Sequence, residues 1–148
     1  MFSSIVVGTD GSQTAREAVG QAVEMAKLFG ASLHVVSAYE PVAGQGLRDV
    51  PTMSPVPDPH WVIKLREEVD ATLEEAAAIA RDARVAVSVY ARQGDAADAI
   101  LDVAEERGAD LVIIGNKGMT GAKRFLLGSV PNKVSHYAPC AVMIIRTR

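Results

Sequence analysis

Residues 111 to 129 read LVIIGNKGMTGAKRFLLGS. The four aliphatic residues that open this segment are typical of a short strand buried on both faces of a sheet. A glycine-rich loop follows the strand directly, and a short helix is predicted from about residue 129 to residue 138. A buried strand that leads through a loop into a helix is a building block of parallel α/β sheets, so this segment decides the class of fold.

The rest of the chain repeats the same alternation of strand and helix. Ile5–Val7 is a β-branched run that predicts a strand, and Ser12 is placed to cap a helix that Gly30 ends. Further strands are predicted at 33–39, 85–91 and 141–145, with one helix starting near Val62 and another between Asp95 and Gly108. This order predicts an α/β fold with one parallel sheet and helices on both faces. The 148 residues show no linker and no second copy of the unit, which favours one domain spanning residues 1–148.

Composition places the chain among ordinary globular proteins. Hydrophobic residues make up 49% of it and charged residues 22%, and no apolar run approaches the roughly 18 residues that a membrane-spanning helix needs. The first residues lack the basic and apolar stretches of a secretory signal, so we expect a soluble, cytoplasmic protein with no membrane partner. Cys140 is the only cysteine, which excludes a disulfide framework and a thiolate zinc site.

Charge is divided unevenly along the chain. Residues 1–110 carry all 18 acidic residues and 9 of the 15 basic ones, whereas residues 111–148 carry 6 basic residues and no acid. This division favours a local anion site near the end of the chain, although surface patterning without a function is the alternative. The overall charge of −3 argues against a nucleic-acid partner, because such binding relies on an extended basic face.

The loop after the fourth strand has the residues of a phosphate site. Gly115 and Gly118 allow the backbone to turn tightly and to approach a ligand closely. Gly128 and Ser129 lie just before the helix, where N–H groups and the helix dipole favour phosphate, and Ser129 is predicted to cap the helix and to offer a hydroxyl donor. The loop also contains three basic residues with no acid nearby: Lys117, Lys123 and Arg124. A glycine-rich turn with a purely structural role stays open as the alternative.

Asp10 is the acidic residue best placed to join this site. It follows the first strand, and ligands of open parallel sheets bind beyond the carboxyl ends of the strands, where the strand order reverses. Its carboxylate is able to accept from ribose hydroxyls or to hold a divalent cation beside phosphates. The alternative is a local role, in which Asp10 caps the first helix or forms an Asx turn. The glycine-rich loop itself matches neither the P-loop nor the dinucleotide-binding fingerprint.

These residues resemble the universal stress protein family over nearly the whole chain, from Ile5–Ser12 to Ala141–Ile145. The most specific part of the resemblance is the motif G-x2-G-x9-G-[S/T], which is met at Gly115, Gly118, Gly128 and Ser129. Within that family the motif marks the subgroup that binds ATP. The resemblance implies a Rossmann-like, five-stranded parallel sheet in the order 3-2-1-4-5, with one crevice between the loops after strands one and four.

The resemblance also implies roles for individual residues. The adenine and ribose would lie near the loop after the first strand and near Ala38, and the phosphates would lie near the glycine-rich loop and the helix after it. The expected nucleotide-binding set is Gly8, Thr9, Asp10, Ala38, Gly115, Asn116, Lys117, Gly118, Met119, Lys123, Arg124, Gly128, Ser129 and Val130. Pro131 follows where several members have a hydroxyl residue, which leaves the choice among ATP, AMP and cyclic AMP open. A divalent cation such as Mg²⁺ would come with the nucleotide and use Asp10.

The leading functional prediction is an adenine-nucleotide-binding regulatory protein of the stress response, with ATP as the first candidate ligand. A slow ATPase or phosphotransferase is the second hypothesis. Phosphoryl transfer needs a base or a water-positioning group beside the γ-phosphate, whereas the loop supplies only Lys and Arg, so we rank binding above catalysis. The third hypothesis is a dimeric interaction module in which the nucleotide is a structural ligand.

Two segments outside the nucleotide loop carry further predictions. The strand at 141–145 is apolar on both faces yet lies at an edge of the expected sheet, so we predict a homodimer that pairs through it. Residues 41–59 contain five of the seven prolines, which predicts a loop that is mobile without ligand and closes over the nucleotide.

Overall fold

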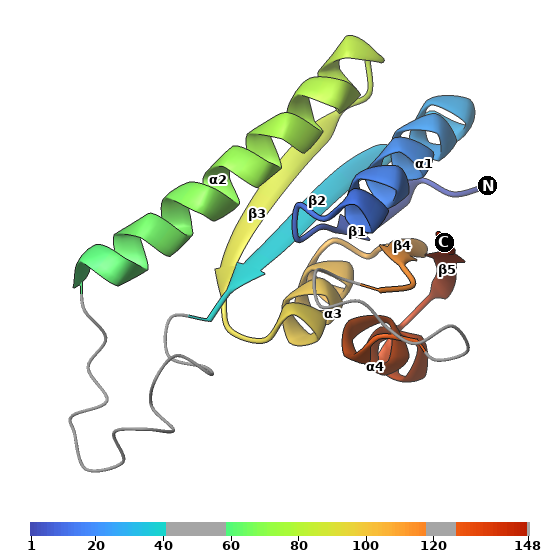
Figure 1. Ribbon diagram of the computed structural model, residues 1–148. Helices are drawn as coiled ribbons and strands as arrows, with labels where there is room; N and C mark the ends of the chain where they lie inside the picture. Colours follow the sequence, from blue (N-terminus) through green and yellow to red (C-terminus); the bar gives the residue numbers. More distant parts are fainter. Residues whose placement is uncertain (41–58, 118–126, 148) are drawn as a thin grey trace.

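A computed structural model gives the fold of the chain and describes residues 1–40, 59–117 and 127–147, with the backbone alone at 59–62 (Figure 1). The elements in chain order are β1 (Ser4–Gly8), α1 (Gln13–Phe29), β2 (Ser32–Tyr39), α2 (Pro59–Asp82), β3 (Val87–Gln93), α3 (Ala96–Glu106), β4 (Leu111–Gly115), α4 (Ser129–Tyr137) and β5 (Ala141–Ile145). The predicted mobile loop at 41–59 lies outside the described residues, apart from Pro59, which begins α2. The same is true of four predicted site residues: Gly118, Met119, Lys123 and Arg124.

The five strands form one parallel sheet in the order β3-β2-β1-β4-β5, which confirms the predicted α/β fold class and strand order. The chain builds outward from β1 to β3 and then returns to the other side of β1, where it adds β4 and β5. Val7 of β1 consequently lies opposite Val35 of β2 on one side and opposite Ile113 of β4 on the other. The strand order reverses between β1 and β4, and ligands of such sheets bind beyond the carboxyl ends of these strands.

Alternate residues of each strand face two separate cores. Ile5 and Val7 of β1 pack with α1 and α2, whereas Val6 packs with α3 and α4. All three side chains are fully buried. Figure 1 shows the two helix pairs on opposite faces of the sheet. A strand between two helical layers needs apolar residues on both faces, which explains the continuous aliphatic runs in the sequence.

The structure confirms the predicted capping residues at both ends of α1 and at the start of α3. Ser12 Oγ accepts a hydrogen bond from Ala15 N at 3.2 Å, and Gly30 ends α1 in the left-handed conformation with φ 66°. Asp95 caps α3 in the same way, through a hydrogen bond from Asp98 N at 3.0 Å. These ends follow from local chemistry, because a capping side chain satisfies an N–H group that the helix itself leaves without an acceptor.

The start of α2 and both ends of β3 differ most from the predictions. α2 begins at Pro59, ahead of the expected start near Val62, because the fixed φ of proline suits the first turn of a helix. β3 begins at Val87 rather than at Val85. Arg84 adopts a left-handed φ of 61°, and Val85 N donates to Ala80 O at 2.9 Å, so Val85 still belongs to the turn that ends α2.

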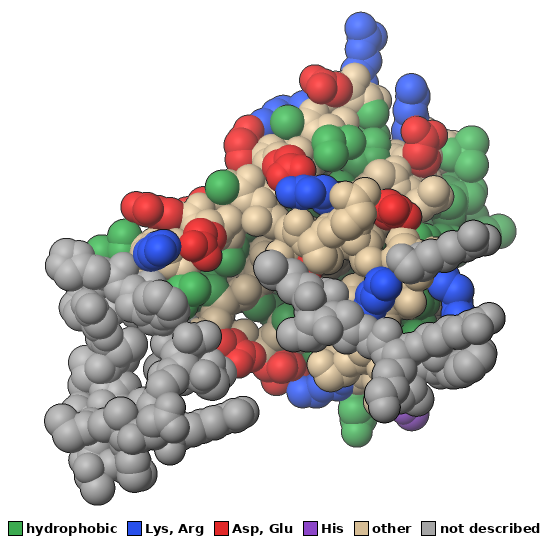
Figure 2. All heavy atoms as spheres, viewed as in Figure 1, with side chains coloured by type: hydrophobic (Ala, Val, Ile, Leu, Met, Phe, Trp, Pro, Cys, Tyr) green, Lys and Arg blue, Asp and Glu red, His purple; other side chains and the backbone are tan. Residues whose placement is uncertain are grey.

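The surface of the described residues carries charge of both signs. On the face in Figure 2, Asp and Glu side chains alternate with Lys and Arg side chains instead of separating into two regions. None of the helices in the described ranges is both long enough and apolar enough to cross a membrane.

Candidate functional site

A cavity of about 280 Å³ lies beyond the carboxyl ends of β1 and β4, where the strand order reverses. Its volume is close to the lower end of the roughly 300–1,000 Å³ that is typical of small-molecule sites. Its walls come from the ends of three strands and from three helices. The lining residues are Gly8, Thr9, Asp10, Ala15, Val36, Ala38, Ala96, Ile100, Ile114, Gly115, Lys117, Gly128, Ser129, Val130 and Pro131.

The structure brings most of the predicted site residues to this cavity. Those that line it are Gly8, Thr9, Asp10, Ala38, Gly115, Lys117, Gly128, Ser129 and Val130. Asn116 lies between two lining residues but is not one of them. Its side-chain Oδ1 accepts a hydrogen bond from Thr147 N at 3.0 Å, so this atom is engaged with the segment after β5.

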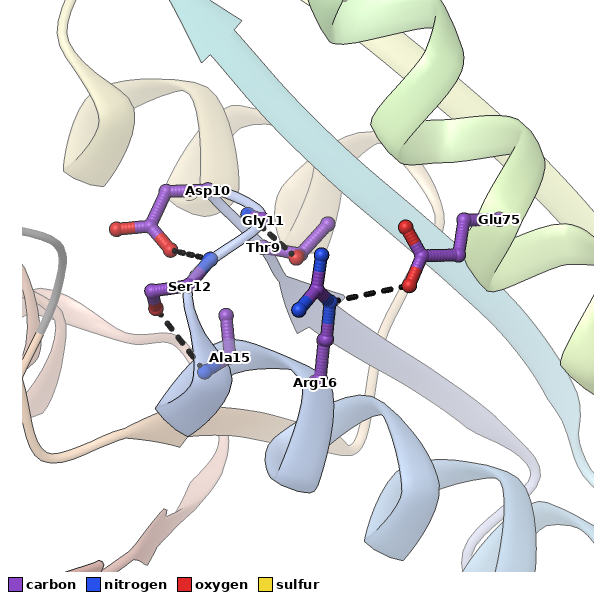
Figure 3. Close-up of polar contacts among 7 residues, drawn as sticks. All are labelled: Thr9, Asp10, Gly11, Ser12, Ala15, Arg16 and Glu75. Atoms are coloured by element: carbon purple, nitrogen blue, oxygen red, sulfur yellow. Dashed lines mark hydrogen bonds and ion pairs between the residues drawn. The ribbon is translucent and has the colours of Figure 1, made fainter.

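The turn between β1 and α1 forms one wall of the cavity, and short-range hydrogen bonds hold the turn in shape (Figure 3). Gly11 N donates to Thr9 Oγ1 at 3.2 Å, and Ser12 N donates to Asp10 Oδ1 at 2.9 Å. Thr9 N also donates to Val36 O at 2.9 Å, which fixes the turn to the end of β2. Asp10 therefore makes the local contact of an Asx turn and lines the cavity as well, so its local role and a ligand-binding role are compatible.

Arg16 is the basic residue nearest to this turn in sequence, and it is directed away from Asp10. Figure 3 shows its guanidinium pointing toward Glu75 of α2, with Arg16 Nε 3.0 Å from Glu75 Oε1. Both side chains are about half exposed, so this ion pair contributes little to stability. Arg16 links α1 to α2 and is not a lining residue of the cavity.

The start of α4 forms the opposite wall of the cavity. Gly128 is the N-cap of this helix, with extended backbone angles and with its carbonyl accepting from Asn132 N at 3.1 Å. The prediction that Ser129 is the N-cap is wrong, because helical geometry already begins at Ser129. Gly128 has no side chain to cap the helix. The N–H groups of Ser129 and Val130 have no acceptor within α4, and Pro131 carries no N–H. The cavity is thus lined by a helix start with two backbone donors.

Lys133 ties α4 to the start of α3. Its Nζ lies 2.7 Å from Asp98 Oδ1 and 3.4 Å from Asp95 Oδ2. The hydrogen bond to Asp98 raises the pKa of Lys133 above its usual value, so the ion pair persists at neutral pH. Lys133 is not a lining residue of the cavity, and Lys117 is the lysine that the described residues contribute to the lining.

Two glycines of the site lie close to other protein segments, and at Gly115 the neighbour includes backbone. A Cβ atom on Gly8 would lie 2.4 Å from Ile100 Cδ1, at the end of a side chain that is able to shift. A Cβ atom on Gly115 would lie 2.5 Å from Thr14 Cγ2 and 3.3 Å from Thr14 O, and the latter is a backbone atom of α1. The sequence predicts that Gly115 allows close approach of a ligand. The structure adds a second reason, since α1 itself approaches this position closely.

Several lining residues were not predicted as site residues: Ala15, Val36, Ala96, Ile100, Ile114 and Pro131. Ala96 and Ile100 belong to the apolar face of α3, and the sequence pattern of this face predicts that it is buried without indicating what it faces. Apolar periodicity is the same for a helix that faces a core and for one that faces a cavity. A Rossmann-like topology, which places the start of α3 beyond the strand ends, is the signal that would have selected them.

The chemical groups of the cavity come from the backbone and from a few side chains. No group of three or more His, Cys, Asp or Glu side chains comes together among them to hold a metal ion. Cys140 lies outside the cavity lining, and burial raises the pKa of its thiol, which keeps the thiol protonated at neutral pH. The lining combines backbone amides, the carboxylate of Asp10, the ammonium of Lys117 and apolar walls.

A doubly wound parallel sheet with a small-molecule cavity at its switch point defines a Rossmann-like α/β protein. A sequence model of the Universal stress protein family matches residues 1–146, and the chain belongs to that family.

Individual members of the family are similar to this chain over its whole length. Universal stress protein YxiE of Bacillus subtilis is 33% identical over 99% of this chain and 100% of its own length. Among solved structures, a universal stress protein in complex with cAMP is 30% identical with a TM-score of 0.71, covering 99% of this chain and 98% of that one. The universal stress protein from Archaeoglobus fulgidus in complex with dAMP is 27% identical with a TM-score of 0.69, covering 97% of each chain.

Proposed function

We propose that this chain binds an adenine nucleotide in the cavity between β1 and β4, with ATP as the first candidate and AMP and cyclic AMP as the alternatives. The observation that carries the proposal is the start of α4, where Ser129 and Val130 line the cavity and have backbone N–H groups without a helical acceptor. Such a helix start attracts phosphate through its dipole and its donors. The cAMP and dAMP complexes of the two similar proteins favour an adenine nucleotide in particular.

The two ends of the cavity suit the two ends of a nucleotide. Val36 and Ala38 at the end of β2, together with Ile100 of α3, provide an apolar wall for the base. Asp10 offers a carboxylate to the ribose hydroxyls. The glycine-rich motif of residues 115–129 supports membership of the ATP-binding subgroup. In this proposal the phosphate end is completed by Gly118, Met119, Lys123 and Arg124.

Mg²⁺ is part of the proposal as an ion that enters with the nucleotide. Phosphate oxygens supply most of the ligands of Mg²⁺ in nucleotide sites, and Asp10, which faces the ribose in our proposal, would join them beside the phosphate that the ribose carries. Titration of ATP with and without a chelator tests this point, because ATP affinity should fall when Mg²⁺ is removed.

We infer a regulatory binding role in the stress response rather than catalysis. Hydrolysis needs a group that positions or deprotonates water beside the γ-phosphate. Asp10 is the one carboxylate in the described lining, and on our proposal it lies at the ribose end. ATP turnover should therefore be slow or absent, and turnover faster than about 1 s⁻¹ would move the protein into the range of ordinary enzymes.

We also propose that the protein forms a homodimer through β5. This strand lies at an edge of the sheet, with Ala141 exposed and its other residues half-buried. An apolar edge strand invites pairing with another strand, and pairing with a second copy would cover it. Light scattering at micromolar concentration should give twice the chain mass of 15.6 kDa, and a monomer would contradict the proposal.

Calorimetry with ATP, AMP, cyclic AMP and adenosine tests the proposed function, with GTP as the control for base recognition. We expect ATP to bind with a Kd of about 100 μM or tighter, and GTP to bind at least about tenfold more weakly. Adenosine should bind more weakly than ATP, because it keeps the contacts at the base end of the cavity and lacks those at the phosphate end. Absence of binding by all three adenine nucleotides at about 1 mM would overturn the proposal.

A further inference from the structure

Asn116 lies at the junction of three segments that are far apart in the sequence. Its backbone N donates to the carbonyl of Ile145, the last residue of β5, at 2.9 Å. Its backbone O accepts from Gly128 N at 3.0 Å, and its side-chain Oδ1 accepts from Thr147 N at 3.0 Å. One residue therefore joins the two ends of the loop after β4 to the segment that follows β5.

Thr147 is held from a second side. Its hydroxyl oxygen lies 2.7 Å from the hydroxyl oxygen of Thr14. Thr14 is a buried residue in the first turn of α1, next to Ala15 in the cavity wall. The segment after β5 is thus fixed between α1 and the loop, and neither Thr147 nor Asn116 is a lining residue of the cavity.

These contacts decide where α4 begins. Gly128 is the N-cap of α4, and the hydrogen bond from Gly128 N to Asn116 O holds it in place. A displacement of Asn116 would move Gly128 and, with it, the backbone donors of Ser129 and Val130. Asn116 is in turn held by Ile145 and Thr147, so a chain of hydrogen bonds connects the helix start to the segment after β5.

We propose that Asn116 is a positioning residue that couples the nucleotide cavity to the segment after β5, and that its side chain does not contact the nucleotide. This inference rests on the function proposed above. Nucleotide affinity then depends on Thr147, which lies outside the cavity lining. Because linkage is reciprocal, a bound nucleotide stabilises the Thr147 contact to the same degree. A partner that fixes or displaces the edge of the sheet at β5 would accordingly raise or lower the affinity for nucleotide.

Calorimetry with ATP on matched variants tests the coupling. Thr147→Pro removes the N–H that Asn116 accepts, whereas Thr147→Ser keeps both the N–H and the hydroxyl and is the control. Asn116→Ala removes the acceptor. We expect Thr147→Pro and Asn116→Ala each to bind ATP about three- to tenfold more weakly, which corresponds to one net hydrogen bond, and Thr147→Ser to bind like the parent. The double variant should have the same ATP affinity as whichever single variant binds ATP more weakly, because both changes remove the same contact.

Hydrogen exchange gives a readout that does not depend on affinity. In the parent protein, ATP should slow the exchange of the Thr147 amide. In ligand-free Asn116→Ala, the Gly128 amide should exchange several-fold faster than in the parent, although its own acceptor, Asn116 O, is retained. Far-UV circular dichroism checks that each variant is folded. If Thr147→Pro fails to fold, Thr147→Val replaces it, because this change keeps the N–H and removes the hydroxyl that contacts Thr14 Oγ1 at 2.7 Å and Asn116 Oδ1 at 3.5 Å.

The outcomes separate this inference from the function on which it rests. A parent protein that binds no adenine nucleotide overturns the proposed function, and this inference with it. A parent that binds ATP, with Asn116→Ala and Thr147→Pro binding it equally well, overturns this inference alone. Fully additive losses in the double variant also overturn it, because Asn116 would then act separately from Thr147.

Discussion

The two walls of the cavity are built in different ways. The turn after β1 is held mainly by neighbours in the sequence, through the bonds from Gly11 N to Thr9 Oγ1 and from Ser12 N to Asp10 Oδ1, and one backbone bond from Thr9 N to Val36 O joins it to β2. The described ends of the loop after β4, at Asn116 and Gly128, are held by contacts between residues far apart in the sequence, and the bond between Asn116 and Thr147 spans 31 positions. Local side-chain bonds predominate at the first wall, and contacts between distant residues predominate at the second.

This difference predicts how substitutions at each wall affect the stability of the fold and the binding of a ligand. A locally bonded turn keeps its shape when distant parts of the protein loosen, whereas a loop held by distant residues opens with them. Substitutions near the first wall should therefore change stability or one ligand contact at a time. Substitutions near the second wall should change stability and the geometry of the phosphate end together.

Gly115→Ala should have the largest effect, at the second wall. The new Cβ would lie 2.5 Å from Thr14 Cγ2 and 3.3 Å from Thr14 O, so α1 or β4 must move. We expect the free energy of unfolding, measured by urea denaturation, to fall by about 1–3 kcal/mol, as for other overpacked sites. Gly20→Ala in α1 is the matched control, because its Cβ would meet no atom within 4 Å and should stabilise the helix by roughly 0.5–1 kcal/mol.

A second substitution shows whether the clash is with Thr14. Thr14→Ser removes Cγ2 and keeps the hydroxyl that contacts Thr147. Combined with Gly115→Ala, it should recover part of the lost stability, because the two changes are coupled through one contact. A Gly115→Ala protein as stable as the parent would show that α1 does not constrain this position.

Ser12→Ala should have the next largest effect, at the first wall. It removes the side-chain oxygen that accepts from Ala15 N at 3.2 Å, and loss of such a cap lowers stability by about 1 kcal/mol. ATP affinity should stay close to that of the parent, since Ser12 is not a lining residue and its backbone N–H to Asp10 is retained. Urea denaturation and calorimetry measure the two quantities, and Ser12→Asp, which restores a capping acceptor, is the control. A loss of affinity as large as the loss of stability would contradict a locally held wall.

The same difference explains how much of the molecule could be predicted from its sequence. Ser12, Gly30 and Asp95 were placed correctly because each acts on residues within one turn of itself. The strand order followed from the family resemblance, and the alternating elements agreed with it.

What could not be predicted depends on contacts between distant residues. The packing of Thr14 against Gly115 and the bond between Thr147 and Asn116 leave no local pattern in the sequence. Ser129 was misplaced as the N-cap because a hydroxyl residue before a helix is the usual cap, whereas Gly128 takes that position with its N–H held by Asn116. The residues of α3 were missed since an apolar face has one pattern for a core and for a cavity.

Two substitutions of Asp10 separate its local contact from its proposed ligand contact. Asp10→Asn keeps an oxygen that accepts from Ser12 N but removes the charge, and Asp10→Ala removes both. We expect both variants to bind adenosine and ATP about five- to tenfold more weakly, which corresponds to a hydrogen bond with a charged acceptor at the ribose. Only Asp10→Ala should also lower the free energy of unfolding. Equal binding by the parent and by Asp10→Asn would show that the charged carboxylate of Asp10 does not contribute to ligand binding.

Asp110→Asn should have the smallest effect, at the end of the sheet opposite the cavity. The Asp110 carboxylate accepts from Ser3 N at 2.9 Å, from Ser4 N at 3.1 Å and from Ser3 Oγ at 3.0 Å. The backbone hydrogen bond from Ser3 lowers the pKa of Asp110 in the folded protein below its ordinary value. The ionised carboxylate therefore stabilises the folded state above its unfolded pKa of about 3.9, and this contribution is lost as the pH falls through the lower folded pKa.

Asp110→Asn should consequently be less stable than the parent at about pH 7, and the difference should shrink below about pH 4, as urea denaturation at several pH values would show. ATP affinity near neutral pH should stay unchanged, because Asp110 precedes β4 and its carboxylate accepts hydrogen bonds at the amino end of β1. This variant loosens the sheet without touching the contacts between Thr147 and Asn116. If Asp110→Asn weakened ATP binding as much as Thr147→Pro does, then a general loss of sheet stability would be enough to weaken binding at the phosphate end. The contact between Asn116 and the segment after β5 would then have no specific role in binding.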